Sequence, residues 1–130
     1  METTESIFPQ DEALLSRSTD NLIQDLSSDS YFTRGRALVG LGNRLSREAE
    51  LADQLLMAIR SPVNRRTPFM GFVMVSWIGI IMLLSKGNEN QLNRLKTVIE
   101  RWPKNELDDI RSYLKTDTNL MDKFDQLVNS

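Results

Sequence analysis

The sequence predicts an all-α domain, and three observations support this prediction. Apolar residues recur at intervals of three and four from about residue 20 to the end of the chain, which is the spacing of one helix face. Residues that begin or end helices stand at the borders of these segments, among them Ser46, Pro62, Gly87 and Pro103. No window alternates apolar and polar residues for long enough to indicate a strand.

Seven helical segments follow from this spacing. In each of them except 67–85, the apolar residues form one face, and polar or charged residues fill the opposite face. Asn88, with Gln91 three residues later, has the pattern of a capping box at the start of a helix. The expected segments are 20–28, 28–45, 46–60, 67–85, 88–102, 105–115 and 117–128. We expect them to fold into a compact bundle of about six helices.

The segment 67–85 is the most apolar part of the chain. From Phe69 to Leu84 only Ser76 is plainly polar. A membrane span needs about 20 apolar residues, and this run of sixteen falls short of that. The neighbouring segments are all amphipathic and need an apolar partner, so we expect a helix over 67–85 at the centre of the bundle and no transmembrane span. Gly71, Val75 and Gly79 would then form a stripe that lets another helix approach closely.

The length of 130 residues fits one domain. Residues 1–18 mix acids, Ser, Thr and Pro, and we expect an acidic flexible tail with a short helix at Glu12–Leu15. Residues 19–130 form the single helical domain. The first fifteen residues lack the basic and apolar regions of a secretory signal, so a cytoplasmic location is expected by default.

Composition excludes several chemistries. The chain has neither cysteine nor histidine, which rules out disulfides, zinc sites built on these residues, and nucleophilic schemes that need a histidine base. Asp108 and Asp109 are adjacent on a helix and point about 100° apart, so they do not converge as an acid/base pair. We therefore expect no enzymatic activity, no metal and no cofactor.

Charge is unevenly distributed along the chain, although the net charge is only −2. Residues 1–33 carry seven acids and one base, whereas residues 34–66 carry seven arginines and three acids. Such asymmetry can mark an interaction surface. We favour the structural explanation, in which these arginines bond to carbonyls and acids of neighbouring helices or are simply solvated, because no stacking aromatic residues are interleaved with them.

Three segments resemble one another and begin 33 and then 40 residues apart, at residues 21, 54 and 94. In "FTRGRALVGLG" and, less closely, "VNRRTPFMGFVMVSWIG", an apolar residue and an arginine precede small and apolar residues that end in glycine. These two segments resemble the HEAT family of helical repeats. The third keeps only the helix pair and lacks the arginine and the glycines. The resemblance covers residues 20 to about 115 and implies stacked helical hairpins that recognise another macromolecule.

The predicted function is that of a non-enzymatic protein–protein interaction module, such as a small adaptor, a regulatory subunit or an inhibitor. The partner is another protein, and a homodimer is compatible with the pattern. The alternative is an arginine-dependent protein that binds nucleic acid or an anionic membrane. Trp102 could serve as an interface anchor or cover the end of the bundle. The candidate interaction residues are Arg34, Arg36, Arg44, Arg47, Arg65, Arg66 and Trp102.

Overall fold

The computed structural model describes residues 11–129, and within them the fold is all-α. This part contains nine helices and one small antiparallel sheet of two strands. The helices are α2 (Glu12–Ser16), α3 (Thr19–Asp25), α4 (Tyr31–Gly42), α5 (Leu51–Arg60), α6 (Pro62–Arg66), α7 (Val75–Lys86), α8 (Glu89–Ile99), α9 (Lys104–Leu114) and α10 (Thr118–Asn129). The strands β1 (Pro68–Met70) and β2 (Val73–Met74) lie between α6 and α7.

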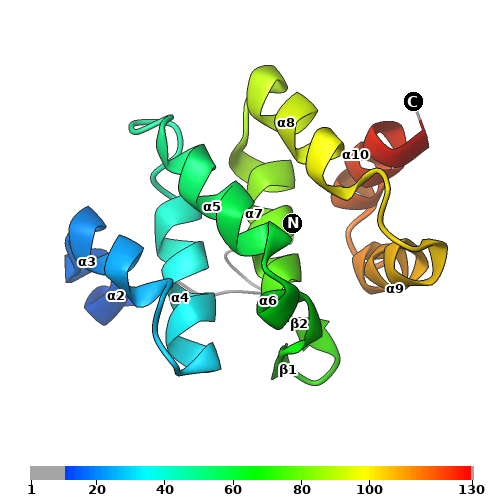
Figure 1. Ribbon diagram of the computed structural model, residues 1–130. Helices are drawn as coiled ribbons and strands as arrows, with labels where there is room; N and C mark the ends of the chain where they lie inside the picture. The colour runs from blue at the N-terminus through cyan, green and yellow to red at the C-terminus, as the bar shows by residue number, and fades with distance from the viewer. Residues whose placement is uncertain (1–10, 130) are drawn as a thin grey trace.

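Helix α7 lies in the middle of the molecule (Figure 1). It packs against α4, α5, α6, α8 and α10. Helices α2 and α3 lie on one side, where α3 packs against α4, and α9 and α10 pack against each other on the other side. The β1–β2 hairpin lies at the lower end of the molecule in this view, next to α6. The predicted apolar helix is therefore central.

The apolar run is the core of the domain. Every residue from Val75 to Leu84 is buried. The hydroxyl of Ser76 donates a hydrogen bond to the carbonyl of Ile59 at 2.9 Å, whereas Nε1 of Trp77 is buried without a hydrogen-bond partner among the described residues. A Cβ on Gly79 would lie 2.7 Å from Cγ1 of Ile59, so this glycine permits the close approach of α5. No helix in residues 11–129 is long and apolar enough to cross a bilayer.

The start of the predicted helix 67–85 is wrong, and so is the expectation that the chain has no strand. The helix begins only at Val75, and the residues before it form the β1–β2 hairpin. Pro68 begins β1, where its missing N–H is tolerated, and Gly71 turns the chain with a φ of +56°. Gly71 therefore does not belong to the helical stripe expected with Gly79.

Residues 11–17 pack against the helical domain. The expected flexible tail covered residues 1–18, of which the first ten lie outside the described residues. Helix α2 lies where the short helix was expected, and its Leu14 is only 2% exposed in the core. Arg44 donates hydrogen bonds to the carbonyl of Arg17 at 2.7 Å and to the hydroxyl of Thr19 at 2.9 Å. These contacts hold α2 and the start of α3 against the end of α4.

Helix starts follow the predicted capping chemistry at α8. The side chain of Asn88 accepts a hydrogen bond from the N–H of Gln91, and the side chain of Gln91 accepts one from the N–H of Asn88, both at 2.8 Å. This confirms the capping box. Gly87 is the C-cap of α7, as expected, although its φ of −78° is not left-handed.

Candidate interaction surface

Large apolar side chains gather at the hairpin and at the first turn of α4. We call this group the aromatic surface. Phe72 is 79% exposed, and three others are between 44% and 52% exposed. Exposed aromatic residues are depleted on ordinary surfaces, and a cluster of them marks an interaction site. The aromatic surface consists of Tyr31, Phe32, Phe69, Met70 and Phe72.

The rings of the aromatic surface support one another. Phe32 stacks on Phe69 with ring centroids 5.5 Å apart and planes within 1° of parallel. Tyr31 meets Phe69 edge to face at 6.5 Å. Such geometries are the favoured ones for aromatic pairs. Phe69 also lies directly over Gly35, where no side chain is present to push the ring outward. Tyr31, Phe32 and Phe69 therefore hold one another in place within the fold.

The hairpin that presents Phe72 is fixed at its base. The N–H of Val75 donates to the carbonyl of Thr67 at 2.9 Å, and the hydroxyl of Thr67 donates to the carbonyl of Val63 at 2.6 Å. Val73 is buried beside Phe72 and anchors β2 to the core. Phe72 lies in the turn between β1 and β2, directly before buried Val73, and is exposed there.

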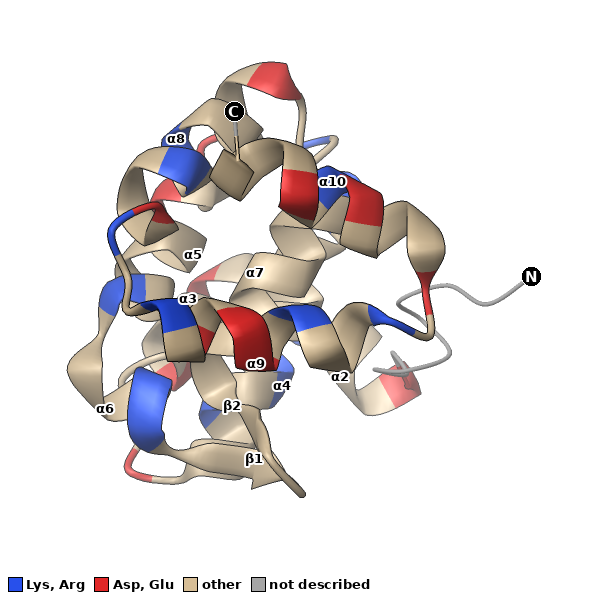
Figure 2. Cartoon of the chain, turned by 90° about the vertical axis from the view of Figure 1, so that its right-hand side faces the viewer, with Lys and Arg blue, Asp and Glu red and all other residues tan. Residues whose placement is uncertain are grey.

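Positive charge lies beside two parts of the aromatic surface. The segments that form the surface, residues 29–36 and 64–74, contain four arginines and one aspartate, but Arg34 and Arg65 bond to groups elsewhere in the fold, which leaves Arg36 and Arg66. Figure 2 shows the hairpin itself without charged residues, and Lys or Arg residues lie in the neighbouring α6 and α4. Arg36 lies with its guanidinium carbon 5.8 Å from the centre of the Phe32 ring, within the range of a cation–π contact. The rim of the aromatic surface is thus basic.

One acid reaches this rim from α2. Arg36 donates a hydrogen bond of 2.7 Å to Asp11, whose carboxylate also accepts the N–H of Leu14. The guanidinium of Arg36, followed by the backbone N–H of Leu14, lowers the pKa of Asp11 below its ordinary value of 3.8. The pair is exposed, with 26% of the Arg36 side chain and 56% of the Asp11 side chain accessible to solvent.

Two other candidate arginines, Arg34 and Arg44, form hydrogen bonds inside the fold. Arg34 donates to the side-chain oxygen of Asn64 at 2.9 Å and to the carbonyl of Ser28 at 2.8 Å. Arg44 bonds to Thr19 and to the carbonyl of Arg17, as described above. These contacts have the form of the structural explanation favoured from the sequence, in which arginines bond to the groups of neighbouring helices.

Arg65 and Trp102 form one unit with α9. Arg65 makes two hydrogen bonds to the carboxylate of Glu106, at 2.6 and 3.0 Å, and its guanidinium carbon lies 4.0 Å from the centre of the Trp102 ring. Glu106 raises the pKa of Arg65 further above its ordinary value. Trp102 therefore lies under an ion pair, where it joins α6 to α9.

Arg47 and Arg66 are exposed, and neither forms an ion pair or a side-chain hydrogen bond with the residues that the structure describes. They belong to different ends of the chain's basic region, since Arg47 follows α4 and Arg66 ends α6. The guanidinium groups of Arg34 and Arg65 face different neighbours, the α3–α4 turn for Arg34 and α9 for Arg65.

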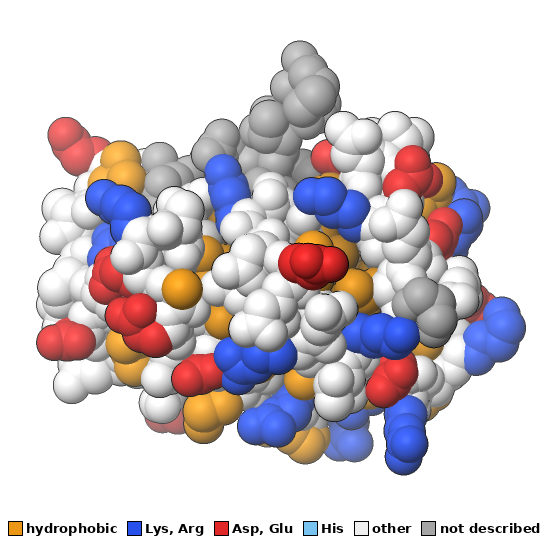
Figure 3. Space-filling view, turned by 90° about the horizontal axis from the view of Figure 1, so that it is seen from above, with side chains coloured by type: hydrophobic (Ala, Val, Ile, Leu, Met, Phe, Trp, Pro, Cys, Tyr) orange, Lys and Arg blue, Asp and Glu red, His pale blue; other side chains and the backbone are white. Residues whose placement is uncertain are grey.

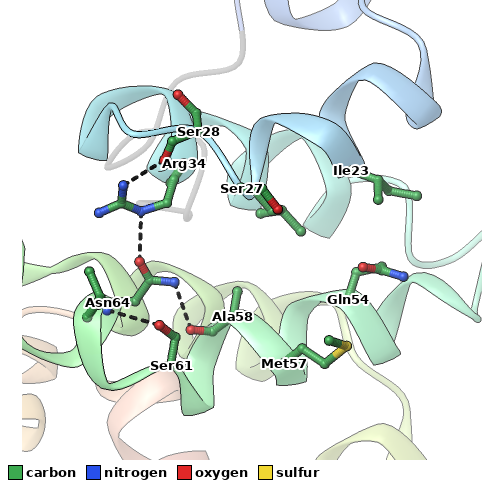
Figure 4. Close-up of a pocket in the computed structure, with 11 residues that line it drawn as sticks. Ile23, Ser27, Ser28, Arg34, Gln54, Met57, Ala58, Ser61 and Asn64 are labelled. Atoms are coloured by element: carbon green, nitrogen blue, oxygen red, sulfur yellow. Dashed lines mark hydrogen bonds between the residues drawn. The ribbon is translucent and has the colours of Figure 1, made fainter.

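A groove of about 340 Å³ lies between α3 and α5 (Figure 4). Ile23, Leu26 and Met57 line its apolar part, while Arg34 and Asn64 join the two walls at one end. Asn64 is buried and also donates to the carbonyl of Ala58 at 2.9 Å. Each of these polar groups has a partner within the fold, so the groove carries less evidence of a binding role than the aromatic surface.

Charges of both signs are interspersed elsewhere. On the face seen from above in Figure 3, acidic and basic side chains alternate, and hydrophobic atoms show only in small spots between them. A face of this kind produces no strong field of one sign. Within residues 11–129, no group of three or more acidic side chains is placed to hold a metal ion.

Sequence reasoning missed the aromatic surface. It assigned Phe69 and its neighbours to a buried helix, because the apolar run continues from the hairpin into α7 without a polar residue. Pro68 and Gly71 were the available signals, since both residue types are frequent in short hairpins.

No protein-family model matches this chain, and neither a curated protein nor a solved structure is significantly similar to it.

Proposed function

We propose that this protein is a non-enzymatic protein-binding module and that the aromatic surface is its binding site. One observation supports this proposal most strongly. Four large apolar side chains, two at the start of α4 and two in the hairpin that packs against it, are 44% to 79% exposed, and Phe69 joins the two groups through its contacts with Tyr31 and Phe32. Aromatic side chains that are held rigidly lose little conformational entropy on binding, and they supply most hot spots in interfaces.

The size of the aromatic surface suits an interface core. At about 200 Å² for each large side chain, the exposed fractions amount to about 450 Å². That is as large as the largest apolar patch of a typical monomer, which is often functional. A standard interface buries about 800 Å² on each partner, of which the apolar centre is only a part. The basic rim would supply the rest.

Within this proposal the protein acts as a small adaptor, a regulatory subunit or an inhibitor. The HEAT-like arrangement of about six helices in hairpins, the cytoplasmic location and a homodimer stay predictions from the sequence. The proposed function does not depend on them, because it rests on the hairpin and on α4.

The arginine-dependent alternative has less support. Phosphate binding needs several free bases on one face. Arg34 and Arg44 bond to neutral groups of the fold, while Arg36 and Arg65 are paired with acids. A titration with single-stranded and duplex DNA at low and high salt tests this alternative. Affinity that falls steeply with salt would support it.

The proposed function is tested by affinity capture with the purified protein and with Phe72→Ser, followed by reconstitution of each captured pair from purified components. Met57→Ser is the matched control, because Met57 is also exposed, at 59%, but lies on α5 in the groove. We expect a reconstituted complex that forms with the wild type and with Met57→Ser and is lost with Phe72→Ser. Complexes that form equally with Phe72→Ser would contradict the proposal.

A further inference from the structure

We infer that the aromatic surface binds a short segment of another protein that carries large apolar side chains flanked by acidic residues. This inference rests on the proposed function and specifies the chemistry of its partner. It combines the exposure of the aromatic surface with the charge of its rim, so each of the two parts can be tested separately.

The charge of the rim is only partly compensated within the fold. Asp11 neutralises Arg36, and Glu106 neutralises Arg65. Arg34 does not belong to this rim, because its guanidinium bonds to the neutral oxygens of Ser28 and Asn64 at the end of the groove between α3 and α5. Arg66 lies two residues before β1 and has no ion pair with a described residue. The rim is therefore complementary to a partner with acidic residues.

The fold already contains one example of such a contact. The carboxylate of Asp11 is held by Arg36, and the guanidinium of Arg36 lies over the edge of the aromatic surface at Phe32. At this rim a carboxylate thus binds an arginine that itself lies over an aromatic ring. We infer that an acid of the partner would make the same kind of contact with the rim. Since the Asp11 carboxylate is more than half exposed, a partner carboxylate can reach the same arginine.

The charge of the rim favours a short segment over a second copy of this chain. In a two-fold dimer the same surface would face itself, so the basic residues of one rim would lie against those of the other. One extended or helical segment needs to cover only the rings and the rim. Short segments of this kind bind through a few apolar anchors in a preformed site.

A lipid bilayer is the other class of partner with some affinity for aromatic residues and arginines. Attraction to an anionic bilayer needs a cluster of several free bases, whereas at this rim Arg36 is already paired with Asp11. The rings of Phe32 and Phe69 also lie parallel and form a platform, with Phe72 alone strongly exposed. The observations therefore favour a protein segment.

The inference is tested by selecting peptides from a random 12-residue display library on the wild-type protein, after depletion on Phe72→Ser. We expect the selected peptides to share at least one Phe, Leu or Trp with Asp or Glu on its flanks. Synthetic, fluorescein-labelled versions should bind the wild type in anisotropy titrations. Phe72→Ser should weaken binding about tenfold or more, and Arg66→Glu about two- to fivefold, while Met57→Ser should leave it unchanged.

Different results would overturn different parts of the account. Selected peptides that depend on Phe72 but carry no acids, or carry bases, would overturn the inferred partner chemistry and leave the proposed function intact. Peptides that bind Phe72→Ser as well as the wild type would overturn both. Sedimentation with vesicles of phosphatidylserine and phosphatidylcholine tests the lipid class, and binding that Phe72→Ser abolishes would replace the inferred protein segment with a bilayer.

Discussion

Gly35 of α4 lies directly beneath the ring of Phe69, and a Cβ built on Gly35 would be 2.3 Å from two atoms of that ring. Because Phe69 in turn supports Tyr31 and Phe32, the absence of a side chain at one helical position decides how three rings are arranged. The arrangement of the proposed binding surface thus depends on a buried glycine beneath it.

Substitution of this glycine should disturb the surface. Gly35→Ala is expected to lower the free energy of unfolding by about 1–3 kcal/mol, since the new methyl group overlaps the Phe69 ring. Urea denaturation measures this change. In the double variant Gly35→Ala/Phe69→Ala the overlap is gone, so the alanine at 35 should cost much less than in the wild-type background. A cost that is the same with and without the Phe69 ring would contradict the contact.

Two neighbouring residues of the hairpin should respond in opposite ways. Phe72→Ser should change the free energy of unfolding by less than about 0.5 kcal/mol, because Phe72 is 79% exposed. Val73→Ser should destabilise the protein by about 2 kcal/mol, because Val73 is buried and the new hydroxyl has no arranged partner. Thermal or urea unfolding of both variants tests this. A large destabilisation by Phe72→Ser would mean that the ring is packed and not presented to a partner.

The joint between α6 and α9 should depend on its ion pair. Glu106→Gln removes the charge that holds Arg65 over Trp102, and we expect a loss of about 1 kcal/mol in stability with a change in Trp102 fluorescence. Asp108→Asn is the control on the same helix. Its pair with Lys104 is largely exposed, so it should cost no more than about 0.5 kcal/mol. Equal costs for the two variants would contradict the role given to Arg65.

The contact of Asp11 with Arg36 makes the docking of α2 sensitive to acid. A carboxyl group whose pKa is lowered in the folded state stabilises that state above its unfolded pKa, here 3.8. This contribution should be lost as the pH falls through the lower folded pKa. An NMR titration should find the Asp11 midpoint below 3.8 in the wild type and closer to 3.8 in Arg36→Gln. A midpoint that Arg36→Gln does not move would contradict the pairing.

The sequence predicted the parts of this fold that depend on local pattern. Helical periodicity identified the all-α class, the apolar run predicted the buried α7, and the spacing of Asn88 and Gln91 predicted the cap of α8. The helix prediction failed at Phe69–Met74. Residues there lie in turn toward the core and toward solvent, but they are apolar on both sides. A strand with an exposed aromatic face has no polar residue to reveal its period.

The candidate arginines show a different limit. The excess of arginines in residues 34–66 could mark an interaction surface, but the partners of several of these arginines lie far away in the sequence. Arg34 bonds to Asn64 and Arg65 to Glu106, 30 and 41 residues apart. Local spacing contains no information on such pairs, so the sequence alone could not separate a free arginine from one that supports the fold. The sequence could not predict the exposed aromatic side chains for the same reason, because their exposure also depends on tertiary contacts.

The most direct test of the central claim is a ¹⁵N-labelled NMR titration of the protein with a selected acidic, apolar peptide. The account predicts that the amide signals of residues 31–36 and 66–74 shift, and that those of α3 and α5 along the groove do not. Shifts confined to the groove between α3 and α5, with the hairpin signals unchanged, would contradict the claim that the aromatic surface is the binding site.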